Sequence, residues 1–306
     1  MRNAFADELT QLAEQDPRLV LLSGDIGNKL FDKFKDIDDL RFYNCGIAEA
    51  NMMGVAAGMA LSGLRPFVYT ITPFTTTRCF EQIRVDVCYH KAPVVIVGTG
   101  AGLSYAELGP THHSLEDIAI LRTLPGMRIL APCDSIELRL ALRAVLEDDS
   151  PTYIRIGKKG EADIHPSPPK FKIGKAIIVR PGNDVSMLCA GNMMFETLKA
   201  ADVLAAKGIS AEVVSFHTVK PLDESYLQSA TTRFKLIATI EEHSRIGGFG
   251  SAVSEWRART NCNLQQISFG TDDEFMHEVG SQEYARKKYG LAAENIATQV
   301  IEALKK

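Results

Sequence analysis

The chain has 306 residues, enough for two domains of ordinary size. A hydrophobic share of 45% and a charged share of 24% are typical of a globular protein, and a net charge of −4 argues against a nucleic-acid or anionic-membrane surface. The first fifteen residues, with three acids among them, do not read as a signal or transit peptide, and no apolar run reaches membrane-spanning length. Six cysteines without CxxC spacing lead us to expect reduced thiols in a cytoplasmic protein, and no metal site.

Short apolar runs alternate with helical patterns along the first half of the chain. The helical pattern at 134–147 begins with Asp134 as a candidate cap and Glu137 three residues later. Strands bounded by Gly, Pro or charge are predicted at 18–23, 66–70, 93–98, 127–131 and 151–156. This alternation predicts an α/β fold with a mostly parallel sheet and helices on both faces.

The segment 157–172 interrupts the alternation, because it carries three prolines, two glycines and many charges. We interpret it as an interdomain linker and predict domains at 1–160 and 173–306, joined by 161–172. A second alternating block predicts another parallel sheet with helices. Its strands are predicted at 185–191, 211–216, 236–240 and 264–269, and its helices at 192–207 and 292–306.

One acid stands out in the stretch 46–64, which reads GIAEANMMGVAAGMALSGL. The pattern is apolar on every side, so we expect a buried helix whose only ionisable residue is Glu49. A buried carboxyl without a partner is costly or keeps its proton, which suits acid–base chemistry. Alternatively, Glu49 only complements the helix dipole in the first turn. The many small residues in this stretch also fit a subunit interface.

Several motifs then appear in a consistent order. They are CGIAEANMMGVAAGMA, FEQIRVDVCYHKAPVVIV at 80–97, GPTHHSLEDIAILRTLPGMRILAPCD at 109–134, VKPLD at 219–223 and IEEHSRIGGFGSAV at 240–253. The ordered set resembles the pyrimidine-binding and C-terminal domains of the transketolase family of thiamine diphosphate enzymes. The resemblance covers nearly the whole chain.

This resemblance implies roles for specific residues. The family's glutamate at the position of Glu49 hydrogen-bonds N1′ of the cofactor's aminopyrimidine, which promotes loss of the thiazolium C2 proton. His112 falls on a histidine that contacts substrate hydroxyls or a developing oxyanion, whereas His113 is expected to point elsewhere. Asp25 resembles an aspartate near the thiazolium in some relatives, and it could equally be a turn residue.

The sequence departs from the family beside the cofactor. Relatives stack an aromatic on the pyrimidine from the segment that here reads TITPFTTTRCF, and counting places Thr75 at one of those positions. Either Phe74 takes the stacking role through a local shift, or the aromatic partner is lost. Arg78 falls where relatives have another cofactor neighbour.

The substrate loop departs as well. Leu108 replaces an aspartate that contacts a sugar hydroxyl in relatives, and an aliphatic side chain cannot accept that hydrogen bond. Lys158 stands where the family often has an arginine for the sugar phosphate, although it could be a solvated linker residue. A sugar phosphate is therefore compatible with the loop, but the natural donor and acceptor stay open.

The family's GDG motif for the diphosphate and Mg²⁺ is absent from the sequence. The resemblance therefore implies the C-terminal subunit of a split transketolase, active with a separate N-terminal subunit that holds most of the diphosphate and metal, in a heterotetramer that includes contacts between two copies of this chain. The expected activity is transfer of a two-carbon ketol unit. The alternatives are a decarboxylating enzyme, similar to deoxyxylulose-phosphate synthase or a 2-oxoacid dehydrogenase beta subunit, and a non-catalytic partner subunit.

Overall fold

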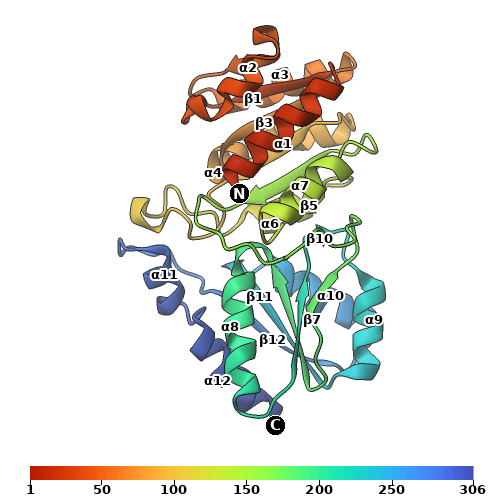
Figure 1. The fold of residues 1–306 in the computed structure, drawn as a ribbon, viewed down its shortest axis with the longest axis vertical. Coiled ribbons are helices and arrows are strands. Elements are labelled where there is room, and N and C mark those ends of the chain that lie inside the picture. Colours follow the sequence, from red (N-terminus) through yellow and green to blue (C-terminus); the bar gives the residue numbers. More distant parts are fainter. Residues whose placement is uncertain (306) are drawn as a thin grey trace.

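The computed structural model describes residues 1–305 (Figure 1). It contains two α/β units, each a sheet with its helices, which are stacked along the long axis of the molecule and are called layers below. The upper, N-terminal layer is built on a seven-stranded sheet in the order β10-β5-β6-β4-β3-β1-β2. Its strands are β1 (Leu19–Ser23), β2 (Phe42–Asn44), β3 (Arg65–Ile71), β4 (Val95–Thr99), β5 (Arg128–Leu130), β6 (Thr152–Ile156) and β10 (Thr218–Lys220). All neighbouring pairs are parallel except β10 with β5.

Seven helices pack on this sheet. They are α1 (Arg2–Gln15), α2 (Asp32–Lys35), α3 (Glu49–Leu61), α4 (Thr72–Thr75), α5 (Phe80–Gln82), α6 (Asp117–Arg122) and α7 (Ser135–Ala144). A wide π-helical stretch, Ile83–Tyr89, continues α5 and contacts α3. The predicted cap of α7 is confirmed, because Asp134 Oδ1 accepts a hydrogen bond of 2.8 Å from the Glu137 amide and Glu137 Oε2 accepts one of 2.8 Å from the Cys133 amide.

The C-terminal layer is a five-stranded sheet in the order β12-β11-β8-β9-β7. Its strands are β7 (Ile177–Arg180), β8 (Val185–Ala190), β9 (Ala211–Ser215), β11 (Leu236–Ser244) and β12 (Gln265–Thr271), and only β7 runs antiparallel. Its helices are α8 (Met194–Ala205), α9 (Glu224–Arg233), α10 (Phe249–Arg259), α11 (Gln282–Lys288) and α12 (Ala293–Leu304). The predicted α/β class with two mostly parallel sheets is therefore confirmed. Residue 306, the end of the predicted terminal helix, lies outside the described residues.

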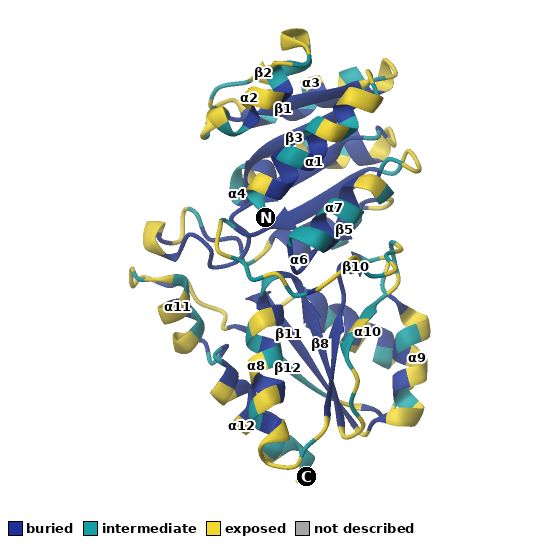
Figure 2. Cartoon of the chain, viewed as in Figure 1, coloured by how far each residue is buried: buried dark blue, intermediate teal, exposed yellow. Residues whose placement is uncertain are grey.

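The central strands are buried on both faces, and the exposed positions lie on the outer sides of the helices and on loops (Figure 2). Helix α3 differs from our expectation of burial on every side. Ile47, just before the helix, is 83% exposed, and Val55 and Leu61 are exposed along one side of the helix. An all-apolar helix pattern does not distinguish a core from a surface that another chain covers, and this face is uncovered in the single chain.

The two layers meet at a buried polar network. Arg155 at the end of β6 pairs with Asp117 of α6 at 2.9 Å, and both side chains are 1% exposed. Tyr153 also donates to Asp117, at 2.6 Å, and Arg155 Nη2 reaches the backbone oxygen of Glu242 on β11. The network ties the first sheet to the second.

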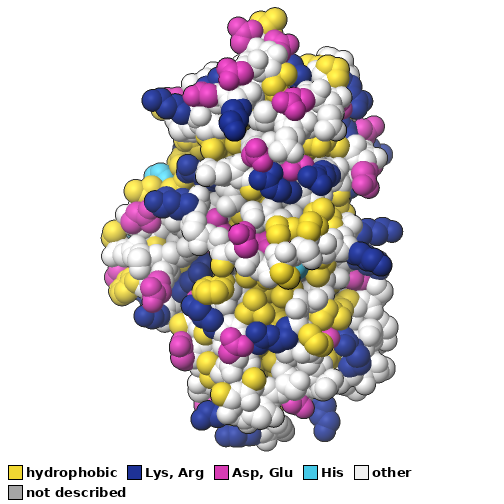
Figure 3. All heavy atoms as spheres, viewed as in Figure 1, with side chains coloured by type: hydrophobic (Ala, Val, Ile, Leu, Met, Phe, Trp, Pro, Cys, Tyr) yellow, Lys and Arg dark blue, Asp and Glu magenta, His cyan; other side chains and the backbone are white. Residues whose placement is uncertain are grey.

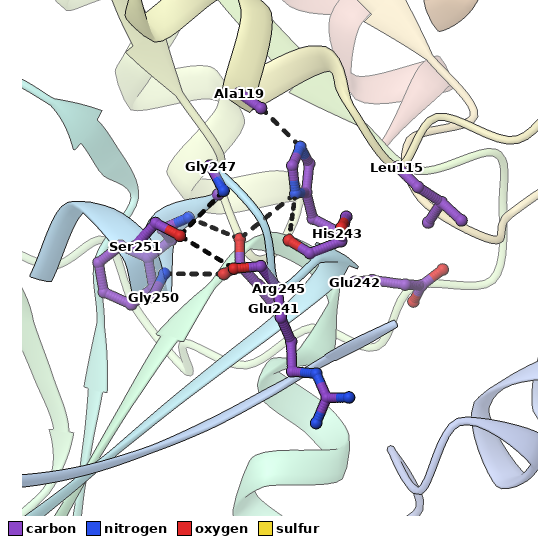
Figure 4. Close-up of polar contacts among 12 residues, drawn as sticks. Leu115, Ala119, Glu241, Glu242, His243, Arg245, Gly247, Gly250 and Ser251 are labelled. Carbon is purple, nitrogen blue, oxygen red and sulfur yellow. Dashed lines mark hydrogen bonds and ion pairs between the residues drawn. The ribbon is translucent and has the colours of Figure 1, made fainter. Parts of the chain in front are cut away.

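The motif IEEHSRIGGFG lies at the same junction (Figure 4). Glu241 accepts hydrogen bonds of 2.7 Å from the amides of Phe249 and Gly250, so a carboxylate caps the first turn of α10. His243 accepts a bond of 3.4 Å from the Ala119 amide, and the Glu242 carboxylate pairs with Arg286 of α11. These contacts give the motif a structural role between the layers.

The surface carries both signs of charge. On the face in Figure 3, Lys and Arg side chains are interspersed with Asp and Glu. Within residues 1–305, every helix is too short or too polar to cross a lipid bilayer.

Candidate active site

Glu49 lies at the first position of α3 and is only 4% exposed. Its carboxylate is paired, because Arg78 Nη1 donates to Glu49 Oε2 at 2.7 Å. This corrects the expectation of an unpartnered acid in an apolar helix. The Arg78 side chain is 42% exposed, so the pair connects a buried acid to the surface.

Phe74 and His112 extend the site from this pair. The guanidinium of Arg78 lies 4.2 Å from the centre of the Phe74 ring, which is a cation–π distance. The His112 ring packs edge-on against Phe74 with 5.4 Å between ring centres, and its other neighbour is Tyr105 at 6.0 Å. Four predicted candidates, Glu49, Phe74, Arg78 and His112, therefore lie in one continuous row.

The far end of the row is Lys158. Its ammonium lies 4.6 Å from the centre of the Tyr105 ring and forms an ion pair with Glu107. The bond from Lys158 lowers the pKa of Glu107 below its usual range. Leu108 follows Glu107 in the same loop and is 48% exposed. Tyr105 and Glu107 were not predicted as site residues. An aromatic residue and an acid shortly before the GPTH motif could have indicated them.

Two other candidates lie beside the row or beneath it. Asp25, in the turn after β1, is exposed, and its Oδ1 accepts a bond of 3.1 Å from Asn44. Its backbone amide donates to Gly46 in the loop leading into α3, so Asp25 lies near the entrance to Glu49. Thr75 is fully buried and its hydroxyl donates to the Thr72 carbonyl. It therefore packs beneath the site in the separate chain, and its contact with a cofactor stays a prediction.

Arg155 and His113 do not contribute to the row. Arg155, three residues before Lys158, is fully buried in its pair with Asp117 and offers nothing to a ligand. His113 is buried, as expected for the histidine that points elsewhere, and burial lowers its pKa below the ordinary value.

The glycine turn at 98–102 serves packing. A Cβ on Gly100, which has φ of +79°, would lie 2.0 Å from the Tyr105 ring, and one on Gly102, with φ of +64°, would lie 2.6 Å from the Glu242 backbone oxygen. The turn therefore lets Tyr105 and β11 approach the first sheet. An open groove of about 1340 Å³ lies elsewhere, on the C-terminal layer, and contains none of the candidate residues.

The arrangement favours a planar, nitrogen-containing ligand. Glu49 offers a carboxyl at the edge of such a ring, Phe74 offers an aromatic face, and His112 offers a polar nitrogen beside it. Three described groups with different chemistry thus converge from helix α3, the α4 turn and the loop after β4.

Comparison with known proteins identifies the family of both halves of the chain. The model of the transketolase pyrimidine-binding domain matches residues 1–160, and that of the transketolase C-terminal domain matches residues 174–296. The chain is 38% identical to the 6-deoxy-6-sulfo-D-fructose transketolase subunit SqwH of Clostridium sp. strain MSTE9, over 97% of this chain and 92% of the relative. It is 35% identical to an apulose-4-phosphate transketolase subunit of Phocaeicola vulgatus, over 100% of this chain and 97% of the relative.

Among solved structures, the chain is similar to a protein described as a split gene transketolase in an inactive beta4 tetramer. The TM-score is 0.90 and the identity 34%, with 99% of this chain and 97% of the other covered. Both layers of the fold are therefore shared with that protein. Together with the two matched domains, this shows that the chain belongs to the transketolase family.

Proposed function

We propose that this chain is the C-terminal subunit of a thiamine diphosphate-dependent transketolase that transfers a two-carbon ketol unit from a ketose to an aldehyde. The observation that carries the proposal is the row that begins at the buried Glu49 and runs through Arg78 and Phe74 to His112. Two relatives named as transketolase subunits, similar over nearly the whole chain, support the same activity.

The residues present fit the pyrimidine half of the cofactor. A planar cationic group, the Arg78 guanidinium, already lies against the Phe74 ring, and one of its nitrogens donates a hydrogen bond to Glu49. An aminopyrimidine is also planar, and its ring nitrogen pairs with a carboxyl. Glu49 and Phe74 would hold this ring once Arg78 turns toward solvent, with Asp25 at the entrance. Thiamine diphosphate, when bound, supplies an electron sink for carbanion chemistry.

The chain's own residues have distinct tasks in this proposal. Glu49 holds a proton between its carboxyl and the ligand ring in a site screened from water. His112 hydrogen-bonds oxygens of the sugar. Leu108 presents an aliphatic surface to the substrate, and Lys158 places a cation at the outer end of the row.

We propose an anionic sugar as the substrate class. The names of two relatives specify a sulfo-sugar and a sugar phosphate, both of which carry an anionic end group. Lys158 already balances Glu107, so an incoming anion competes with this carboxylate for the ammonium. We therefore propose a role for this subunit in carbohydrate metabolism in the cytoplasm, where its six free cysteines stay reduced.

A second polypeptide completes the site in this proposal. It holds the diphosphate and Mg²⁺, because the GDG motif is absent from the sequence. Two copies of this chain associate through the exposed apolar face that includes Ile47, Val55 and Leu61, which gives a heterotetramer of two pairs. The related structure described as an inactive beta4 tetramer supports both self-association and the need for a partner.

The interface is tested by Ile47→Lys, which buries a charge if the face is covered. We expect light scattering to show a smaller assembly than the wild type, while Leu40→Lys, a control at an exposed leucine outside α3, leaves the mass unchanged. An unaltered mass for Ile47→Lys would place the contact elsewhere.

The activity is tested by purifying both subunits together with thiamine diphosphate and Mg²⁺ and following exchange of the cofactor's C2 proton by NMR. We expect Glu49→Gln to slow the exchange at least about 100-fold, because an amide cannot exchange a proton as the carboxyl does. Glu81→Gln breaks a solvent-exposed Glu–Arg pair nearby and should leave exchange unchanged. Near-normal exchange in Glu49→Gln contradicts the assignment.

Product analysis separates ketol transfer from the decarboxylating alternative. Ketol transfer converts a ketose and an aldehyde into a new pair without gas release. Carbon dioxide released from a 2-oxoacid would instead establish decarboxylation, and failure of both reactions in the complex that shows normal cofactor binding would favour a non-catalytic subunit.

A further inference from the structure

One group of three side chains among residues 1–305 has donor atoms placed for a metal ion. The Cys133 Sγ, a Glu137 carboxylate oxygen and a His165 ring nitrogen all lie within 4.8 Å of one another, and all three residues are buried. Cys133 follows β5, Glu137 lies in the first turn of α7, and His165 lies in the segment between the two layers. The cluster uses none of the residues of the row that runs from Glu49 to Lys158.

The individual spacings suit a small ion. His165 Nε2 lies 2.9 Å from Glu137 Oε1 and 3.9 Å from Cys133 Sγ. Ligand atoms around a tetrahedral zinc ion, with bonds of roughly 2.0–2.3 Å, lie roughly 3–4 Å apart. The two spacings of the His165 nitrogen are close to this range, so the imidazole would exchange its hydrogen bond with Glu137 for a bond to the ion.

Asp134 links the start of α7 to the segment that carries His165. Its Oδ2 accepts bonds of 2.9 and 3.0 Å from the amides of Ile164 and His165, while its Oδ1 caps α7. Glu137 Oε2 accepts a bond from the Cys133 amide, and Oε1 shares a hydrogen bond of 2.9 Å with His165 Nε2, which an ion would replace. Such hydrogen bonds around the ligands are what pre-orient a metal site.

His217, between β9 and β10, is a buried neighbour of the cluster and is not one of its three donors. Its side chain is fully buried, and its Nε2 has no hydrogen-bond partner. Its carbonyl accepts a bond of 2.7 Å from the Ala131 amide, two residues before Cys133, and its Nδ1 shares a bond of 3.0 Å with Thr218. Burial lowers the pKa of His217, and the nearby Glu137 carboxylate opposes part of that shift.

We propose that Cys133, Glu137 and His165 bind a zinc ion between the two layers, with a water molecule as the fourth ligand. One thiolate, one imidazole and one carboxylate match the mixed S, N and O donors that zinc accepts, whereas Mg²⁺ prefers oxygen alone. On binding, the Cys133 thiol releases its proton to solvent and the sulfur bonds to the metal.

The site joins two parts of the fold. Its ligands come from the first layer and from the segment that connects the layers, so the ion fixes this segment to the first layer. We expect the zinc-loaded chain to melt at a higher temperature than the same chain after chelation, because a ligand that binds only the folded state stabilises it.

The full-length chain tests this directly. After zinc-supplemented expression and exhaustive dialysis, we expect about one zinc per chain by elemental analysis. After stripping, titration with Co²⁺ should produce a thiolate-to-cobalt charge-transfer band. Cys133→Ser and His165→Gln should lower zinc retention at least ten-fold and, for Cys133→Ser, abolish the band. Cys88→Ser, at a buried cysteine of the opposite side of the sheet, should keep both signals.

The wild-type titration decides the question even where a variant fails to fold, because the band requires a sulfur ligand on the metal. Zinc below a tenth of an equivalent in wild type, or no charge-transfer band on saturation with Co²⁺, overturns the proposal. Equal zinc content in wild type, Cys133→Ser and His165→Gln overturns it as well.

Discussion

The pairs Arg155–Asp117 and Arg78–Glu49 have similarly buried acids, but their arginines differ in exposure. Asp117 and Glu49 are 1% and 4% exposed. Arg155, the partner of Asp117, is 1% exposed, whereas Arg78, the partner of Glu49, is 42% exposed. The same chemical pair is therefore closed at the junction of the layers and open in the candidate active site.

The hydrogen bonds explain the difference. Asp117 is held by two nitrogens of Arg155 and by the Tyr153 hydroxyl, and Arg155 also reaches two backbone carbonyls. Arg78 makes a single bond to Glu49 and rests on Phe74. A buried pair held by several hydrogen bonds stabilises the fold, while a pair with one bond and a solvent-exposed partner can exchange that partner for a ligand.

The closed pair should show the largest effect on folding. Asp117→Asn leaves the Arg155 charge buried without a counter-ion, and we expect the free energy of unfolding to fall by about 3–5 kcal/mol, measured by urea denaturation. Tyr153→Phe, which removes only one hydrogen bond to the same carboxylate, should cost about 1 kcal/mol. Equal losses for the two variants would contradict the distinction.

Acid titration sharpens the same comparison. Burial alone would raise the pKa of Asp117, but the charge of Arg155 overcomes burial and lowers this pKa below its ordinary value. Stabilisation from Asp117 is then complete above the unfolded pKa of about 3.9 and is lost as the pH falls through the lower folded value. We expect the wild type to lose more stability than Asp117→Asn below about pH 4; parallel acid profiles would contradict this.

The open pair should show a smaller effect. Arg78→Gln removes a partly exposed charge from Glu49, and we expect a loss of about 1 kcal/mol in the separate subunit. The loss should disappear in the Glu49→Gln background, so a double-mutant cycle isolates the pair. A cost of 3 kcal/mol or more would mean that Arg78 is a fixed structural partner, like Arg155.

A substitution at the exposed Leu108 should show the smallest effect on folding. Leu108→Asp changes an exposed side chain, so we expect the free energy of unfolding to stay within about 0.5 kcal/mol. A carboxylate there can accept a hydrogen bond from a sugar hydroxyl, and we expect relative kcat/KM to move about ten-fold towards ordinary sugar phosphates. An unchanged substrate profile would contradict the proposed role of this loop.

The central strands could be predicted from the sequence, because β1 and β4 are covered on both faces and read as mostly apolar runs. The edge strands β2 and β7 were missed, since they are short and partly exposed. Strand β10 could not be predicted either, because three residues carry no periodic signal and their partner β5 lies far away in the chain.

The candidate active site, too, could be predicted only in part. Glu49 and His112 could be singled out because each sits in a distinctive local stretch. The partner of Glu49 could not, because Arg78 reaches it only through the packing of the α4–α5 segment on α3. Burial of α3 was predicted wrongly for the single chain, since an apolar pattern indicates that something covers a helix and not which chain does so.

Strand β10 has a consequence for how the molecule can be divided. It leaves the C-terminal half and completes the N-terminal sheet beside β5. A fragment ending at residue 172 would lose this strand and expose the backbone edge of β5, and such an edge promotes aggregation. The two matched domains are therefore one unit for cloning, proteolysis and refolding, even though each has its own sheet.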